Sequence, residues 1–441
     1  MKGLIMKFKG LTLLVLISII FISLIGCSTG PRQDGSAEYP YLLNDGRDLE
    51  SIGHGRFDMN SHYRITNHIH LSDNWTPVGS EDNPFNGVIE GNGYSIRGDV
   101  HSNESYVGLF AYIGKNGIIR DIKFDGNVFA DKGEYIGAIA GINEGLIEKI
   151  TFHGVINSSA DFVGSIAGYN KGDIIDVSHQ GDVYGNNYLG GIVGKNDGLL
   201  SIGFHQGNVG TDIDGNTVVG GVAAINTGII EKISAGGEAY SNYSLESLND
   251  GEFGGIGGLV GFNDGGTISE SFSIKTVYGI DNVGGLIGYS INGLLINSYR
   301  LETLDLKNNY SNNVGLAIGY ADGTVIENVY VTGHINHIDN ANNIGNFIGN
   351  ANNIIVENAY IIAKSGMLTN TFGTSDTNYL IGEITNEAAS NPDEYEGFDF
   401  YKTWAMEKYS GDWQTHWPYP KLISQESKWL THSNWRGSWV Q

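Results

Sequence analysis

The sequence predicts an all-β protein that folds as a parallel β-helix (β-solenoid) of about nine to eleven rungs, or coils, with an N-terminal cap and an aromatic C-terminal cap. The first observation is the motif aliphatic-Gly-x-aliphatic-x-Gly, which recurs about nine times between Val107 and Gly349, roughly every 26 to 37 residues. The second is an Asn-x-Gly or Asp-Gly turn that often follows it. The third is composition: 65 glycines, 7 prolines, 11% aromatic and 40% hydrophobic residues argue against both collagen and disorder.

The residues around each turn predict the strands of a coil. The turn glycines supply positive φ angles at low cost, and two residues beyond them every copy is aliphatic. This column, which we expect to point into the core, is Ile119, Ile147, Ile174, Leu200, Ile230, Ile268, Leu295, Val325 and Ile355. A second glycine about nine residues past the turn opens another short strand; its copies are Gly126, Gly154, Gly181, Gly207 and Gly237. We therefore predict three short strands per coil.

The ends of such a rod expose unpaired strand edges and need caps. We assign residues 39–100 to an N-terminal cap with the first coils, 101–365 to the repeats, and 366–441 to a C-terminal cap with a tryptophan-rich tail. A polar insertion at residues 240–251 is predicted to project as a loop, a binding candidate by position alone.

Residues 1–26 have the layout of a secretory signal, with three early lysines followed by an apolar run from Leu11 to Ile25. The run ends at Cys27, the only cysteine, in a context that resembles a bacterial lipobox. We predict a lipoprotein signal peptide, lipidation of Cys27 and a polar tether over residues 27–38. The protein would then be extracytoplasmic and anchored to the bacterial cell membrane or outer membrane. The alternative is an ordinary signal or membrane anchor that contains one cysteine.

The net charge of the chain limits the classes of partner that it can bind. The formal net charge is −24, and loss of the signal lowers Lys+Arg from 25 to 22 against 49 Asp+Glu. An acidic protein is repelled by nucleic acid and by anionic lipid headgroups. We expect no nucleic-acid partner and a membrane attachment through acyl chains alone.

The repeats resemble the Glug motif, whose Gly-Leu-x-Gly signature stands here at residues 258–261 and 285–288. Segments similar to those that open this family occur in order at residues 48–52, 75–79 and 85–93, and the aromatic segment at 397–404 and 419–422 is similar to its closing segment. The resemblance covers most of the mature chain. It implies a bacterial, secreted or surface-attached parallel β-helix, found in adhesin-like proteins or beside immunoglobulin A protease domains, with no catalytic residues. It also implies that the closing segment seals the final coil.

Motifs for hydrolysis are missing from the sequence. It has no His-Glu-x-x-His, no Gly-x-Ser-x-Gly, and no cysteine besides Cys27. Some parallel β-helices cleave polysaccharides with carboxylates, and charged residues recur four positions past the turn glycines: Asp121, Lys149, Asp176, Lys232, Glu270, Glu327 and Glu357. Asp121 and Asp176 would lie about 10 Å apart with Lys149 between them, which favours charge neutralisation over catalysis.

Two patterns in the sequence are compatible with a metal site, and each has a simpler interpretation. Phe124, Phe152, His179 and His205 fall on successive coils, and a stack of rings explains the two histidines more simply than a metal does. Residues 212–216 carry part of a calcium-loop pattern without its distal glutamate, and we interpret them as a turn. We predict no metal site and no cofactor, with calcium as the only candidate ion.

Six of the seven tryptophans follow Ala363. We expect Trp404 to belong to the cap. Beyond Leu422, sugar stacking and burial are equally expected. The possible ligand-binding residues are Trp413, Trp417, Trp435 and Trp439.

The predicted function is a lipid-anchored, non-catalytic scaffold for binding or adhesion, with a polysaccharide or host surface component as partner. The alternatives are a polysaccharide lyase or hydrolase of the β-helix type, and a passive spacer.

Overall fold

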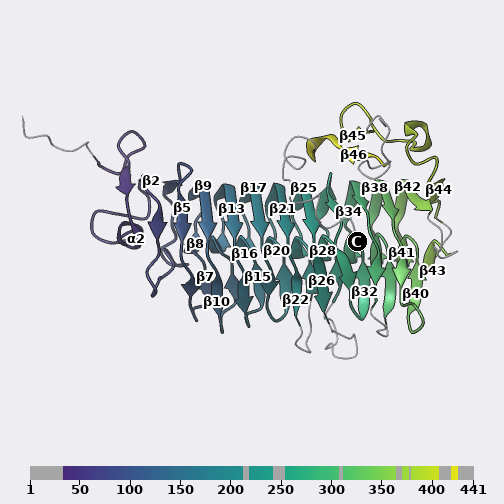
Figure 1. Ribbon diagram of the computed structural model, residues 1–441, viewed down its shortest axis with the longest axis horizontal. Coiled ribbons are helices and arrows are strands. Elements are labelled where there is room, and N and C mark those ends of the chain that lie inside the picture. The colour runs from purple at the N-terminus through teal and green to yellow at the C-terminus, as the bar shows by residue number, and fades with distance from the viewer. Residues whose placement is uncertain are drawn as a thin grey trace, which may run out of the picture.

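The computed structural model describes residues 33–211, 218–241, 254–306, 311–363, 370–376, 379–406 and 419–425. The chain winds into a parallel β-solenoid of about ten coils, seen from the side in Figure 1 with its N-terminal end in purple. The predicted fold class is confirmed.

A complete coil crosses four parallel sheets, which we number I to IV in the order in which the chain meets them. One coil contains β11 (Tyr135–Ile136), β12 (Ala140–Asn143), β13 (Leu146–His153) and β14 (Ile156–Ser158). The prediction of three strands was wrong because the glycine motif itself bends the chain. Its first residue lies in a strand of sheet I, and its last two lie in a strand of sheet II.

The strands of sheets I and II follow one another along the rod. Sheet I contains nine strands: β7 (Tyr106–Val107), β11, β15 (Phe162–Gly164), β19 (Tyr188–Gly190), β23 (Val218–Gly220), β27 (Ile256–Gly257), β32 (Asp281–Gly284), β36 (Asn312–Gly315) and β40 (Asn342–Gly345). Sheet II contains ten: β8 (Phe110–Ile113), β12, β16 (Ala167–Asn170), β20 (Val193–Asn196), β24 (Ala223–Asn226), β28 (Val260–Asp264), β33 (Ile287–Ile291), β37 (Ile318–Asp322), β41 (Ile348–Asn352) and β43 (Phe372–Ser375).

Sheet III is the longest and extends to both ends of the solenoid. Its main path is β1 (Tyr41–Leu43), β2 (His62–Ile65), β4 (Val88–Glu90), β9 (Ile118–Asp125), β13, β17 (Asp173–Gln180), β21 (Leu199–Gln206), β25 (Ile229–Gly236), β29 (Thr267–Ser269), β34 (Leu294–Arg300), β38 (Val325–Thr332), β42 (Ile355–Ala363) and β44 (Gly382–Thr385). Three short strands pair beside this path: β3 (Ile69–His70), β5 (Ser95–Arg97) and β30 (Phe272–Ser273).

Sheet IV closes the coil. It contains β6 (Val100–His101), β10 (Val128–Ala130), β14, β18 (Val183–Tyr184), β22 (Val209–Thr211), β26 (Glu238–Ser241) and β31 (Thr276–Tyr278). A separate pair, β35 (Leu304–Asp305) and β39 (Ile335–Asn336), follows it.

Most of the predicted aliphatic column lies in the core. Its members from Ile119 to Leu295 are 0% exposed, and successive members of this group pair with one another. The last two positions were wrong, because Leu295 pairs with Ile326 and Ile326 with Val356. Gly323 and Asn353 take the turn position of Gly265 and Asn292, one residue before the glycines Gly266 and Gly293 from which the inward position was counted. Ile355 therefore points outward and is 56% exposed.

The turns between sheets II and III contain a ladder of buried asparagines, Asn143, Asn170, Asn196, Asn226 and Asn263, all 0% exposed. Each side-chain amide donates to the side-chain oxygen of the next asparagine at 2.8 to 2.9 Å. The residues with positive φ include Gly265 and Gly323, as predicted, but not Gly145, Gly172 or Gly198. In those three turns the prediction of positive φ was wrong. There glycine is needed because a Cβ would overlap the backbone of the coil below.

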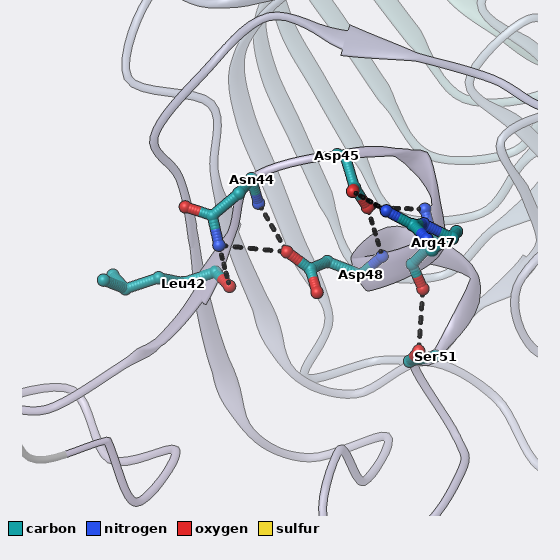
Figure 2. Close-up of polar contacts among 6 residues, drawn as sticks. All are labelled: Leu42, Asn44, Asp45, Arg47, Asp48 and Ser51. Carbon is teal, nitrogen blue, oxygen red and sulfur yellow. Dashed lines mark hydrogen bonds and ion pairs between the residues drawn. The ribbon is translucent and has the colours of Figure 1, made fainter. Parts of the chain in front are cut away.

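The N-terminal cap centres on the short helix α2 (Gly46–Glu50), whose polar contacts are drawn in Figure 2. Asp45 caps the helix by accepting from the backbone N–H groups of Arg47 and Asp48 at 2.9 and 3.2 Å. Asp48 in turn accepts from the backbone and side chain of Asn44. The buried side chains of Leu49 and Ile52 then join the core of the first coil.

The aromatic C-terminal segment packs on the outside of sheet III. β45 (Trp404–Ala405) and β46 (Lys421–Leu422) pair antiparallel and lie along the flank of the rod in Figure 1, in yellow, and two 3₁₀ helices accompany them (η2, Pro392–Glu394; η3, Ile423–Gln425). Trp404 is 0% exposed and lies 6.0 and 5.9 Å from the rings of Tyr299 and Tyr330. The aromatic cap is present, but it covers the flank of the last coils and not the end of the final coil.

Candidate functional site

Several predicted site residues lie outside the described residues. These are the lipidation candidate Cys27, the calcium-loop candidate at residues 212–216, most of the predicted loop at 240–251, and the four tail tryptophans Trp413, Trp417, Trp435 and Trp439. Their roles stay predictions. In the part of the chain that the structure describes, no helix is long and apolar enough to cross a bilayer.

The outer face of sheets I and II carries a strip of aromatic side chains in the coils that follow the N-terminal cap. The rings of Tyr106, Tyr135, Phe162 and Tyr188 in sheet I stack along the rod, with centroids 5.9, 5.2 and 4.6 Å apart. Tyr112 and Tyr169 in sheet II contact this stack, at 6.3 Å from Tyr106 and 5.6 Å from Tyr135. We call these six residues the aromatic strip.

The last glycine of the repeat motif allows the two sheets to approach each other. A Cβ at Gly141 would lie 2.8 Å from the Cβ of Tyr106, and a Cβ at Gly168 would lie 2.7 Å from the Cα of Tyr135. Side chains at these two positions would push sheet II away from sheet I. The glycines therefore set the distance at which the two aromatic columns meet.

A polar network surrounds Tyr169 in the strip. Lys171 and Lys195 place their ammonium nitrogens 4.9 and 4.7 Å from the centre of its ring. Its hydroxyl donates to Asp197, which also forms an ion pair with Lys195 at 3.3 Å. Glu144 accepts from the hydroxyl of Tyr112 at 2.7 Å and pairs with Lys171 at 3.4 Å. Two lysines thus balance two carboxylates.

Protonation states in the strip follow from these contacts. Burial and the carboxylate partners raise the pKa values of Tyr112, Tyr135 and Tyr169 well above the usual value of a tyrosine. Burial acts to raise the pKa of Glu144, but hydrogen bonds from Tyr112 and Lys171 lower it overall. At neutral pH the tyrosines of the strip are therefore neutral phenols, and Glu144 is ionised. The faces of the stacked rings lie against one another, so the strip presents ring edges that can pack against apolar C–H groups, and polar groups that can donate to or accept from hydroxyl groups.

Sequence reasoning missed the strip, although the signal was visible. An aromatic residue directly precedes the aliphatic-Gly pair in four successive copies, at Tyr106, Tyr135, Phe162 and Tyr188. In a solenoid, equivalent positions stack, so a repeated aromatic outside the core pattern predicts an exposed ring column.

The predicted charge column divides into two. Asp121, Lys149, Asp176, Lys232 and Glu270 have positive φ angles of 44° to 58° and interrupt the strands of sheet III, and Asn297, Asn328 and Asn358 take this position in later coils. Glu327 and Glu357 were placed wrongly, because they belong to the neighbouring column that contains Arg120 and Glu148. In that column Arg120 bonds to both Glu90 and Glu148. Asp121 and Asp176 stay two coils apart with Lys149 between them, as expected for a balanced charge column.

The two predicted stacking histidines point into the core. Phe124, Phe152, His179 and His205 stack with centroids 5.3, 4.7 and 5.0 Å apart. The Nε2 atoms of His179 and His205 donate to the carbonyl oxygens of Gly154 and Gly181 at 3.0 and 3.2 Å. Burial lowers the pKa of His179 to about 4 and that of His205 well below its usual value. Both imidazoles are therefore neutral at pH 7.

Two further cationic side chains, which the sequence did not mark, lie in the same core region. The ammonium of Lys275 donates to the carbonyl oxygens of Gly207, Gly236 and Glu238 at 2.6, 2.9 and 3.2 Å. Arg300 donates to the carbonyl of Lys275 at 3.0 Å. Burial lowers the pKa of Lys275 to about 7 and that of Arg300 to about 9. These contacts satisfy backbone carbonyls and have no access to an external ligand, since both residues are 0% exposed.

Metal ligation has no support in the described ranges, where no group of three or more His, Cys, Asp or Glu side chains is placed to hold an ion.

Comparison with known proteins gives partial matches. No protein-family model matches the chain, so the Glug assignment stays a prediction. A protein of Evansella cellulosilytica, provisionally named a Gly-rich membrane protein, is 33% identical over 178 residues, which are 37% of this chain and 20% of that protein. Halomucin of Haloquadratum walsbyi is 27% identical over 134 residues, 28% of this chain and 2% of halomucin. The chain thus spans a fifth or less of either relative.

Among solved structures, a protein of Bacteroides ovatus provisionally named an immunoglobulin A1 protease aligns with 90% of this chain and 95% of its own. The TM-score is 0.41 and the identity 16%, a likeness too low to carry an argument about fold or function.

Proposed function

We propose that this protein is a lipid-anchored, extracytoplasmic β-solenoid that binds an extended polysaccharide along its aromatic strip without converting it. The observation that carries the proposal is the stack of Tyr106, Tyr135, Phe162 and Tyr188, which repeats one ring per coil along the rod axis. A polymer with repeating units, laid along the rod, would meet equivalent rings at regular intervals.

The polar groups of the strip suit a neutral sugar polymer. Lys171 and Lys195 pair with Glu144 and Asp197, and Glu81 and Glu134 add carboxylates beside Tyr106 and Tyr135. The strip thus offers hydrogen bonds to hydroxyl groups, while its net negative charge disfavours an anionic chain. Tyrosine is well suited to such a surface because its ring is apolar and its hydroxyl is polar. The overall charge of −24 would repel an anionic polymer.

The proposed location rests on the N-terminal sequence and on the name of one relative. The predicted signal and Cys27 suggest export and lipidation, and the name of the Evansella relative refers to a membrane. Incorporation of labelled palmitate that a Cys27→Ser variant abolishes would support the anchor. Accumulation of the unprocessed chain in the cytoplasm would contradict it.

The test uses the mature protein, from Ser28 onward, on a panel of immobilised neutral polysaccharides. Replacing Tyr135 and Tyr169 with alanine should weaken binding by tenfold or more per ring, about 1.4 kcal/mol each. Tyr184→Ala is the matched control, because Tyr184 lies on sheet IV and, like Tyr169, donates to an aspartate, at 2.8 Å.

The same incubations separate the alternatives. Shortened or unsaturated products would show a lyase or hydrolase and overturn the non-catalytic proposal. Absence of binding by the wild-type protein, with its thermal unfolding intact, would leave the passive spacer as the better account.

A further inference from the structure

The N-terminal cap contains an open cavity of about 490 Å³ that no predicted role uses. It lies between the segment that follows α2, with Ile52 and Met59, and the segment 72–79. Its volume falls within the range of small-molecule sites, which is about 300 to 1,000 Å³.

The cavity adjoins the N-terminal end of the aromatic strip. Val78, on its wall, pairs with Phe110 in the first strand of sheet II. The next lining residue, Gly79, packs so closely that a Cβ there would lie 2.7 Å from the carbonyl oxygen of Tyr112. Two residues further on, Glu81 accepts a hydrogen bond from the hydroxyl of Tyr106 at 3.2 Å. A chain lying on the strip would therefore reach the cavity at the end of the rod.

The lining combines an apolar side with a polar side. Ile52, Met59, Pro77 and Val78 supply apolar surface. Glu50, Ser72, Asn74 and Thr76 supply donors and acceptors, and Ser72 already donates to Glu50. Sugar rings present the same combination, with apolar C–H faces and a rim of hydroxyls.

The charge of the lining narrows the ligand class. It contains one carboxylate, Glu50, one histidine, His54, and neither lysine nor arginine. A carboxylated or phosphorylated sugar would meet this carboxylate without a lysine or arginine to balance it. The lining favours a neutral unit.

We propose that this cavity, which we call the end pocket, binds the terminal unit of a neutral polysaccharide whose following units lie along the aromatic strip. The inference rests on the proposed function and adds to it: the protein recognises chain ends, and the polymer binds in one register. A protein that used the strip alone would bind internal segments and ends equally.

The experiment compares oligosaccharides of cellulose, xylan and mannan in two forms, one native and one with both terminal units O-methylated. Binding to the mature protein is measured by calorimetry. Thr76→Trp fills the end pocket from an exposed position. Asn157→Trp, which adds the same ring at an exposed position on sheet IV, is the control. Thermal unfolding confirms that each variant is folded.

If the end pocket is used, methylation weakens wild-type binding by tenfold or more, and Thr76→Trp weakens binding of the native oligosaccharide by a similar factor. Methylation then has no further effect on Thr76→Trp, and Asn157→Trp behaves as wild type. Equal binding of native and methylated forms, with Tyr135→Ala still weakening both, would overturn the end pocket and leave the proposed function standing. Binding that neither Tyr135→Ala nor Thr76→Trp weakens would overturn both.

A second readout is independent of the strip. Methyl glycosides of glucose, xylose and mannose are single units, and saturation-transfer NMR detects their contact with protein. At least one should give a signal that Thr76→Trp removes and Tyr135→Ala leaves unchanged. Absence of any signal from the wild-type protein at millimolar concentration would count against the end pocket even if the strip binds polymer.

Discussion

The side-chain amide of Asn170 donates to the side-chain oxygen of Asn196 at 2.8 Å, in the middle of a ladder that is fully enclosed between sheets II and III. Asn196 in turn donates to Asn226 at 2.9 Å and to the carbonyl oxygen of Gly198 in its own turn at 3.1 Å. One side chain thus connects two neighbouring coils and holds the turn between them. Buried polar groups stabilise a fold in this way only when all their partners are present.

Asn196→Ala should therefore lower the free energy of unfolding by roughly 2 to 4 kcal/mol, because it leaves the side-chain oxygen of Asn226 buried without its amide donor and takes from the amide of Asn170 one of its two acceptors. Asn263→Ser is the matched change at the end of the ladder, where the next coil already has Ser290. Asn263→Ser should lower the free energy of unfolding, measured by urea denaturation, by less than half as much as Asn196→Ala does. Equal costs at the two positions would show that the ladder does not act as a connected unit.

The ladder and the core column show how far the sequence predicts this fold. Repetition of Ile119, Ile147 and Ile174 predicted the register, because parallel stacking places each residue on its copy. The same reasoning failed at Val325 and Ile355, because Gly323 and Asn353 occupy the turn position of Gly265 and Asn292, one residue before the glycines from which the inward position was counted. All four residues have positive φ, a shared feature that spacing alone does not reveal.

The candidate site was less predictable for a different reason. The sequence contains the aromatic residues of the strip, but its geometry depends on Gly141 and Gly168 bringing sheet II against sheet I. Similarly, Trp404 was expected in a cap, yet its position on the flank depends on the outward tyrosines of sheet III. Contacts between sheets come from the bend angles of the coil, which a list of repeats does not specify.

The histidine stack predicts a loss of stability in acid. The pKa of His179 is about 4 in the fold, against about 6.5 for an unfolded histidine, so between these values the unfolded chain binds a proton that the folded chain excludes. Stability should fall as pH drops through this window, by roughly 3 kcal/mol from His179. His179→Phe, which continues the ring stack from Phe152, should remove this share of the loss between pH 6.5 and pH 4. The double variant that also carries His205→Phe should remove the remaining histidine share, because burial lowers the pKa of His205 too.

The control is His70→Gln, because His70 is exposed on β3 and makes no part of the stack. Urea unfolding at a series of pH values gives the comparison. A slope that survives unchanged in the variant with both histidines replaced would assign the acid sensitivity to the carboxylates instead.

The buried ammonium of Lys275 predicts how the stability of the fold changes above pH 7. Its pKa is about 7 in the fold and about 10.4 when unfolded, so above pH 7 the unfolded chain holds a proton that the folded chain has released. Stability should rise by about 2 to 3 kcal/mol between pH 7 and pH 9. Lys275→Met removes this rise, whereas Lys132→Met, at an exposed lysine, keeps it. A wild-type profile without a rise would show that the three carbonyl contacts hold the ammonium charged throughout.

Trp404 predicts that the flank segment can be detached while the solenoid stays intact. The ring is fully buried, 4.6 Å from Phe398, and packs on Tyr299 and Tyr330 of the outer column of sheet III. Trp404→Ala should cost about 3 to 5 kcal/mol of this packing, enough to release the segment that contains β45 and β46. The stacked coils keep their own hydrogen bonds and core, so their unfolding midpoint should move little.

Limited proteolysis of the Trp404→Ala protein should then cut between residues 386 and 406 much faster than in wild type, while circular dichroism keeps its β-sheet signal. Tyr401→Ala, at a side chain that is 95% exposed, should leave the cleavage rate unchanged. Global unfolding of the Trp404→Ala protein would instead mean that the flank segment stabilises the last coils as one unit with them.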